Sequence, residues 1–158
     1  MWGKNPLRPV RDRRYFESMS VLIADNDRAV SGLLTEVLGQ AGIKPAHAYD
    51  GEEARRMAME PGVEVLVCDL DMPGATGLEV LESLRGLDRQ PLVVVISGYL
   101  DAKIEAELRT MRFVKEVLRK PFDLLGFAAV VRRLLALARQ ADGGRVGDGA
   151  EQEQAADG

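Results

Sequence analysis

The chain has 158 residues, which is enough for one domain with a sizeable core but too short for two full domains. Hydrophobic residues make up 46% and charged residues 29%, which is typical of a globular protein. The formal net charge is −4, so the chain offers no strong basic field for binding nucleic acid. One cysteine, Cys68, and one histidine, His47, exclude an intramolecular disulfide and a His/Cys zinc site, which leaves oxygen ligands for any metal.

Three segments differ in composition. Residues 1–18 are basic and contain no apolar core, so they are not a secretory signal, and they predict either a solvated arm or one that binds an acidic partner or anionic lipid. Residues 19–140 predict the folded domain, and residues 141–158 a disordered tail. Because no stretch approaches the roughly 18 apolar residues of a membrane span, we expect a cytoplasmic protein without membrane or nucleic-acid partners.

The first half of the domain alternates apolar runs with helical spacing. A predicted strand over 21–24 is followed by a helix whose apolar residues recur at helical spacing over 30–41. A second, weaker strand over 43–49 precedes a short helix around 54–58, and a third strand covers 63–68.

The second half continues the same alternation. Leucines at helical spacing predict a helix over 78–84, and the clearest apolar strand follows over 92–96. A helix with a thin apolar stripe over 101–111 leads to a strand over 114–118, and an amphipathic helix over 124–138 closes the domain.

Five strand–helix units of this kind predict one α/β fold. Apolar strands separated by helices indicate a parallel sheet that is covered on both faces. At this length we expect a flavodoxin-like, doubly wound, five-stranded sheet with strand order 2-1-3-4-5 and five helices. Such sheets bind ligands outside the carboxyl ends of their strands.

Polar side chains follow four of the five predicted strands. Asp25 and Asn26 come after the first strand, Asp69 after the third, Ser97 after the fourth and Lys120 after the fifth. Carboxylates hold hard divalent cations, and an ammonium and a hydroxyl stabilise phosphoryl oxygens. The set therefore suits a magnesium ion with a phosphoryl group, and a carboxylate can act as the nucleophile that forms an aspartyl phosphate.

The runs VLIADND, LVCDLDMPGATG, VVVISG and LRKPFD, in this order, resemble the motifs of the response-regulator receiver domains of two-component signalling. The resemblance covers about residues 19–140 and points to a stand-alone, chemotaxis-regulator-like member. It implies phosphoryl transfer from a sensor histidine kinase or histidine phosphotransfer protein, and output to a target protein through the fourth helix, fifth strand and fifth helix. It implies no enzyme activity beyond self-phosphorylation and self-dephosphorylation.

The resemblance also implies a role for each site residue. Asp69 matches the phosphoacceptor, and Ser97 and Lys120 match the hydroxyl and the lysine that contact the phosphoryl group. Mg²⁺ or Mn²⁺ is expected on Asp25, Asn26, Asp69 and the backbone carbonyl of Asp71, as a metal cofactor. The Lys120–Pro121 peptide bond is expected to be cis.

Two positions depart from the family pattern. Asn26 stands where a second acid is usual, so we expect weaker magnesium binding, by ~1–3 kcal/mol. Asp27 could compensate, but it fits a helix N-cap better. Val117 stands where an aromatic switch residue is usual, so output would run through backbone and helix shifts or be weak.

Two other functions remain open at this point. A pseudo-receiver, which binds partners without switching by phosphorylation, would explain Asn26 and Val117. A haloacid dehalogenase-like phosphatase shares the Asp69-x-Asp71 pattern, but it needs a second acidic pair after the lysine, and only Asp123 follows Lys120 in the domain. No output domain is expected in the chain, and the sequence leaves the kinase, the target and the oligomeric state open, a dimer being one option.

Overall fold

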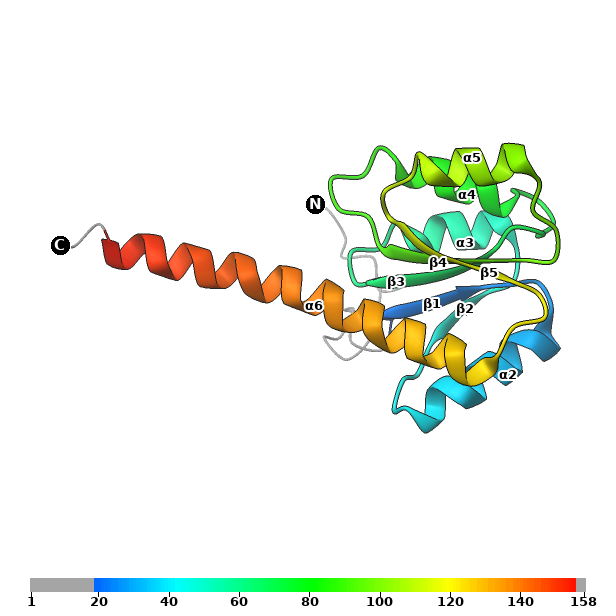
Figure 1. Ribbon diagram of the computed structural model, residues 1–158, viewed down its shortest axis with the longest axis horizontal. Coiled ribbons are helices and arrows are strands. Elements are labelled where there is room, and N and C mark those ends of the chain that lie inside the picture. The colour runs from blue at the N-terminus through cyan, green and yellow to red at the C-terminus, as the bar shows by residue number, and fades with distance from the viewer. Residues whose placement is uncertain (1–18, 156–158) are drawn as a thin grey trace, which may run out of the picture.

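The computed structural model describes the backbone of residues 19–155 and the side chains of residues 19–141, so the basic extension over 1–18 lies outside the described residues (Figure 1). The strands are β1 (Val21–Ala24), β2 (Ala46–Ala48), β3 (Val65–Asp69), β4 (Leu92–Ser97) and β5 (Val114–Arg119). The helices are α2 (Arg28–Gln40), α3 (Gly51–Ala58), α4 (Gly77–Leu84), α5 (Ala102–Arg109) and α6 (Leu124–Ala155).

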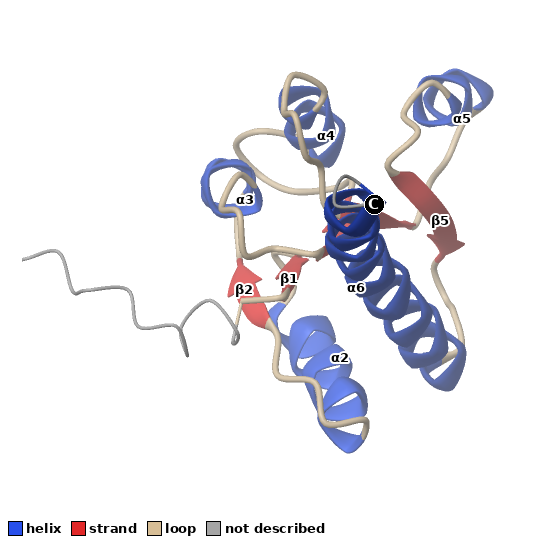
Figure 2. Cartoon of the chain, turned by 90° about the vertical axis from the view of Figure 1, so that its left-hand side faces the viewer, coloured by secondary structure: helices blue, strands red, loops and turns tan. Residues whose placement is uncertain are grey.

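The five strands form one parallel sheet in the order β2-β1-β3-β4-β5. This order and the five helices of the described part confirm the predicted flavodoxin-like fold. Helices α3, α4 and α5 cover one face of the sheet, and α2 and α6 cover the other (Figure 2). In chain order, α5 and α6 are the fourth and fifth helices of the domain.

Alternation along the buried strands divides the core into two layers. Leu22, Leu66 and Val93 face α3 and α4, whereas Val21 and Val65, one residue earlier in β1 and β3, face α2 and α6. Every residue of β1 and β3 is buried because both faces of the central sheet are covered. This burial on both faces explains why the sequences of β1 and β3 are apolar runs without alternating polar residues.

Two predicted strands differ from the structure at their ends, and one predicted helix differs in which residues it buries. The second strand is shorter than the expected 43–49 because Pro45 lacks an N–H for the ladder, and β2 begins directly after it. Val63 belongs to the turn before β3, where its N–H donates to the carbonyl of Glu60. In α2 the predicted apolar residue Leu33 is 52% exposed, and Ser31 is buried in the helix instead.

Helix α6 is longer than the composition predicts. Its first half packs Phe127, Val131 and Leu134 against the sheet, and its backbone then continues to Ala155, away from the domain (Figure 1). The backbone over 141–155 is thus helical in the structure, although the composition predicts a disordered tail over 141–158; residues 156–158 lie outside the described residues. Extending an existing helix forms one more hydrogen bond per residue fixed, so a nucleated helix continues more readily than a new one starts.

Two glycines let the loop after β3 pack closely on its neighbours. A Cβ at Gly77 would lie 2.5 Å from Leu70 Cα and still closer to the Asp69 carbonyl oxygen. A Cβ at Gly51 would collide with the backbone of Ala75 in the same loop. The loop that carries residues 70–76 is therefore held against the end of β3 by two contacts that no larger residue permits.

The substitution Gly77→Ala should therefore lower the free energy of unfolding by about 1–3 kcal/mol, the usual cost of overpacking. Gly32→Ala is the matched control, because a Cβ at Gly32 in α2 meets nothing within 4 Å. It should raise stability by about 0.5–1 kcal/mol, the gain from replacing glycine inside a helix. Urea unfolding of the two variants and the parent protein measures both effects, and equal midpoints for Gly77→Ala and the parent would contradict the close packing.

Candidate functional site

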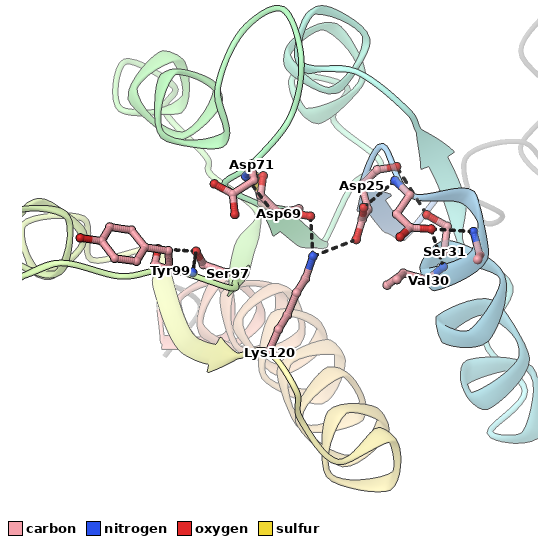
Figure 3. Close-up of polar contacts among 11 residues, drawn as sticks. Asp25, Val30, Ser31, Asp69, Asp71, Ser97, Tyr99 and Lys120 are labelled. Atoms are coloured by element: carbon pink, nitrogen blue, oxygen red, sulfur yellow. Dashed lines mark hydrogen bonds and ion pairs between the residues drawn. The ribbon is translucent and has the colours of Figure 1, made fainter.

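The sequence-predicted site residues meet at the carboxyl edge of the sheet. Asp25 follows β1, Asp69 ends β3, Ser97 ends β4 and Lys120 follows β5, so four strands each deliver one side chain to the same edge (Figure 3). Asp25, Asp69 and Ser97 are buried, with at most 2% of each residue exposed.

The two carboxylates are held in the same way. Oδ1 of Asp25 accepts a hydrogen bond from the N–H of Asp27 at 2.8 Å, and Oδ1 of Asp69 accepts one from the N–H of Asp71 at 2.9 Å. An acid that bonds the amide two residues later closes a local turn as its strand ends. Each carboxylate is therefore fixed by one oxygen, and its Oδ2 atom remains for the chemistry of the site.

Lys120 joins the two acids. Its Nζ atom donates to Asp69 Oδ2 at 2.8 Å and lies 3.9 Å from Asp25 Oδ2 (Figure 3). Asp25 Oδ2 is buried and accepts no hydrogen bond from the described residues. One ammonium thus serves two buried carboxylates, and it bonds Asp69 more closely.

This shortage of positive charge changes the acidity of the groups. Burial, together with the repulsion from Asp69, raises the pKa of Asp25 from 3.8 to about 6, although the Asp27 N–H and Lys120 oppose the change. For Lys120, burial lowers the pKa, but its hydrogen bond to Asp69 and the charges of Asp69, Asp25 and Asp71 outweigh burial and raise it. The ammonium therefore stays protonated while Asp25 carries an electrostatic cost when ionised.

The chemistry of this donor set fits a hard cation. Mg²⁺ typically takes one or two protein carboxylates and fills its other positions with water and phosphate oxygens. Asp25 and Asp69 supply two such carboxylates, and Oδ2 of Asp25 is a buried oxygen without a hydrogen-bond partner among the described residues. Within residues 19–141 no three His, Cys, Asp or Glu side chains cluster as a metal centre, so further ligands would have to come from neutral oxygens or water.

Ser97 is at the predicted edge, but its hydroxyl is turned toward the following loop. Its Oγ donates to the carbonyl oxygen of Tyr99 at 2.6 Å and accepts from the N–H of Tyr99 at 3.1 Å (Figure 3). Both of these hydrogen bonds are to the Tyr99 backbone, and neither is to Asp69 or Lys120. Tyr99 itself is 70% exposed.

The other predicted site residues lie next to the two buried acids or beside Lys120. Asp27 is the N-cap of α2, because its side chain accepts from the N–H groups of Ala29 and Val30, and this confirms the capping prediction. Asn26 and the Asp71 side chain are exposed beside the two buried acids. The Lys120–Pro121 bond is cis, as the resemblance implies.

Cys68 and His47 lie outside the chemistry of the site. Cys68 is buried in the core layer under α3 and α4, and burial beside Asp69 raises the pKa of its thiol to about 12. His47 Nε2 lies 3.0 Å from Thr35 Oγ1, and its ring stacks on Tyr49. Burial lowers the pKa of His47, and none of these contacts of Cys68 and His47 involves Asp25, Ser97 or Lys120.

Val117, at the position where an aromatic residue is usual, lies beside an open hollow. It is 39% exposed on β5 and lines a hollow of about 350 Å³ between α5 and β5, together with Leu108. Charged side chains bridge the same face through the ion pairs Arg119–Glu105 and Arg133–Glu116.

Ser31 is a site neighbour that the sequence analysis missed. It is buried at 2% exposure in α2, with its Oγ 3.5 Å from the carbonyl oxygen of Asp25. A serine does not register in a search for apolar periodicity, so only its helical spacing from Leu34 and Leu38 could have indicated that it faces the core.

Comparison with known proteins agrees with this arrangement. The family profile of the response regulator receiver domain matches residues 21–132. The chain is 30% identical over 117 residues to the transcriptional regulatory protein CpxR of Klebsiella pneumoniae, covering 73% of this chain and 48% of CpxR. It is 34% identical over 126 residues to the response regulator MprA of Mycobacterium tuberculosis, covering 79% and 54%. The chain thus spans about half the length of the curated relatives it matches.

Solved structures show the same fold. A CheY-like receiver domain protein from Methanospirillum hungatei matches with a TM-score of 0.71 at 17% identity, covering 78% of this chain and 98% of that one. The receiver domain of AraT, a response regulator from Geobacillus stearothermophilus, matches with a TM-score of 0.66 at 30% identity, covering 77% and 96%.

The chain belongs to the response-regulator receiver domain family, a class of signal-transduction domain in two-component systems. In the described part, no helix is both long and apolar enough to cross a membrane.

The raised pKa of Asp25 predicts a stability that depends on pH. An acid whose pKa is higher in the folded than in the unfolded state favours unfolding once it ionises, so the contribution of Asp25 to wild-type stability should fall as the pH rises from about 4 to 6. At pH 7 in a chelator, Asp25→Asn should be more stable than wild type by about 1–3 kcal/mol, and the difference should vanish below pH 4. Urea unfolding at several pH values checks this, with the exposed Asp71→Asn as control. A variant no more stable than wild type at pH 7 would contradict it.

Proposed function

We propose that the chain is a phosphorylatable receiver in which Asp69 accepts a phosphoryl group from a histidine kinase or phosphotransfer protein and which signals by protein contact. The observation that carries the proposal is the buried Asp69 carboxylate with the Lys120 ammonium 2.8 Å from its Oδ2. A core acid serving only a structural role would not need a lysine delivered by a strand that is not its neighbour in the sheet.

The chemistry of transfer follows from these groups. A carboxylate oxygen of Asp69 attacks the phosphorus of the donor, a new P–O bond forms, and the P–N bond to the donor imidazole breaks with its electron pair left on nitrogen. Lys120 is placed to neutralise charge on the phosphoryl oxygens, and the Ser97 hydroxyl can donate to one of them after it turns from Tyr99.

A magnesium ion on Asp25 and Asp69, with Asn26 and the carbonyl of Asp71, would offset the charge that builds up on the phosphoryl group. The support from this chain is the pair of buried carboxylates and the buried Asp25 Oδ2 without a hydrogen-bond partner in the described part. Asn26 contributes an amide oxygen without charge, so the site binds the cation with two acids instead of three.

The downstream partner would be a protein that contacts the face formed by α5, β5 and α6. The hollow beside Val117 and the two ion pairs lie on that face. Since none of the described residues that line the hollow is aromatic, output would depend on shifts of the backbone and of α5. Relatives such as CpxR are transcriptional regulators, and only about half of each is matched here.

A pseudo-receiver is the second candidate, and two observations favour it. Asn26 removes one acid, and the Ser97 hydroxyl is engaged by the Tyr99 backbone instead of the site. A haloacid dehalogenase-like phosphatase is set aside because the chain belongs to the receiver family.

Incubation with acetyl phosphate and Mg²⁺ separates the two candidates. Intact mass should rise by one phosphoryl group in the wild type and in Asp71→Asn, because the Asp71 side chain is exposed and the proposed metal contact is made by its backbone carbonyl. Asp69→Asn should gain nothing. If neither the wild type nor Asp71→Asn gains mass at high Mg²⁺, and partners bind Asp69→Asn as well as wild type, the pseudo-receiver is the better account.

The substitution Asn26→Asp should strengthen magnesium binding. A carboxylate in place of the amide adds one charge-assisted ligand worth ~1–3 kcal/mol, so the Mg²⁺ concentration needed for half-maximal phosphorylation should fall by about 5- to 150-fold. Asp27→Asn is the control: the Asp27 side chain caps α2, and asparagine caps a helix about as well as aspartate, so both the stability and the magnesium requirement should stay close to those of the parent protein. An unchanged requirement in Asn26→Asp would show that residue 26 is not a ligand.

A further inference from the structure

Two hollows lie at the amino-terminal edge of the sheet, opposite the carboxylate site. One of about 170 Å³ and one of about 190 Å³ share Val63, Asp88 and Arg89 as walls. Apolar residues form much of the lining of both, namely Ala58, Met59, Pro61, Leu87, Pro91 and Leu92. A cavity of about 150 Å³ admits a benzene ring, so each hollow is large enough for one aromatic side chain.

The described chain begins at this groove. Met19 is buried, and the carbonyl oxygen of Ser20 accepts hydrogen bonds from the N–H groups of Glu64 at 2.8 Å and Val65 at 2.9 Å. Glu64 lines the first hollow, and Val63 beside it lines both. The segment before Met19 is thus tethered within one or two residues of the groove.

The composition of residues 1–18 complements the lining of the two hollows. Tyr15 and Phe16 stand four and three residues before Met19, a reach of about 10–14 Å in extended chain. Residues 1–18 hold five basic side chains against two acidic ones. The hollows are lined by the acids Glu60, Glu64 and Asp88 against one base, Arg89, and Glu64 also pairs with Arg139 of α6.

We propose that the basic amino-terminal segment docks on its own domain at this groove, with Tyr15 and Phe16 on the apolar lining and Arg13 and Arg14 toward the acids. A short tether gives a high effective concentration, so modest contacts suffice to hold the segment. Because Ala138 and Ala141 of α6 line one hollow, the docked segment would also contact the last helix. The carboxylate edge on the other side of the sheet stays open.

Hydrogen–deuterium exchange of the full chain tests the proposal. The informative amides are Val63 and Leu87, which donate to the carbonyls of Glu60 and Leu84 in turns that line the groove. In Tyr15→Ser/Phe16→Ser they should exchange roughly five-fold faster than in wild type, relative to the amides of α5 in the same sample. Arg13→Gln/Arg14→Gln should show a smaller increase, and added salt should reduce it.

Leu125→Ser is the matched control, because Leu125 is 71% exposed at the start of α6, near the opposite edge of the sheet. It should leave exchange in the groove unchanged. Equal relative exchange in wild type and Tyr15→Ser/Phe16→Ser would overturn the proposal. So would protection that grows with protein concentration, which indicates a second copy in the groove, or protection that requires anionic vesicles, which assigns the segment to a lipid surface.

Discussion

The contact between Lys120 and Asp69 is the interaction on which the site depends. It connects residues 51 positions apart, and it places one positive charge beside two buried carboxylates. Buried charges are tolerated only when they are paired, so the residues that deliver this lysine are as constrained as the acids themselves. The parallel sheet satisfies that constraint because all its strands end at the same edge.

Backbone contacts also hold the two acids of the site in place. Each acid is fixed by an amide two residues later, and the loop after β3 is pressed onto the strand end by contacts that only glycine allows at positions 51 and 77. The acid-bearing turns are therefore rigid, while Oδ2 of Asp25, which faces the site, has no hydrogen-bond partner among the described residues. Two fixed carboxylates that share a single ammonium are suited to binding a cation and, together with it, an anion.

Much of this could be predicted from the sequence, and the failures have local causes. The strand order and the convergence of Asp25, Asp69 and Lys120 follow from apolar runs that each end in a polar residue. Pro45 shortened the second strand, and the buried Ser31 escaped a search for apolar periodicity. The direction of the Ser97 hydroxyl depends on the turn at Tyr99, which residue type alone does not determine. The helical backbone over 141–155 has no apolar stripe that could have indicated it.

The bonds between Ser97 and Tyr99 have a consequence for coupling. A serine hydroxyl has one proton, and here that proton satisfies the Tyr99 carbonyl. If the hydroxyl turns to another acceptor, the carbonyl loses its partner and the loop before α5 is released. By thermodynamic linkage, this coupling between the Ser97 hydroxyl and the Tyr99 loop is reciprocal. A molecule that binds and fixes the Tyr99 loop keeps the hydroxyl bonded to Tyr99, and a ligand that accepts a hydrogen bond from the hydroxyl makes the loop more mobile.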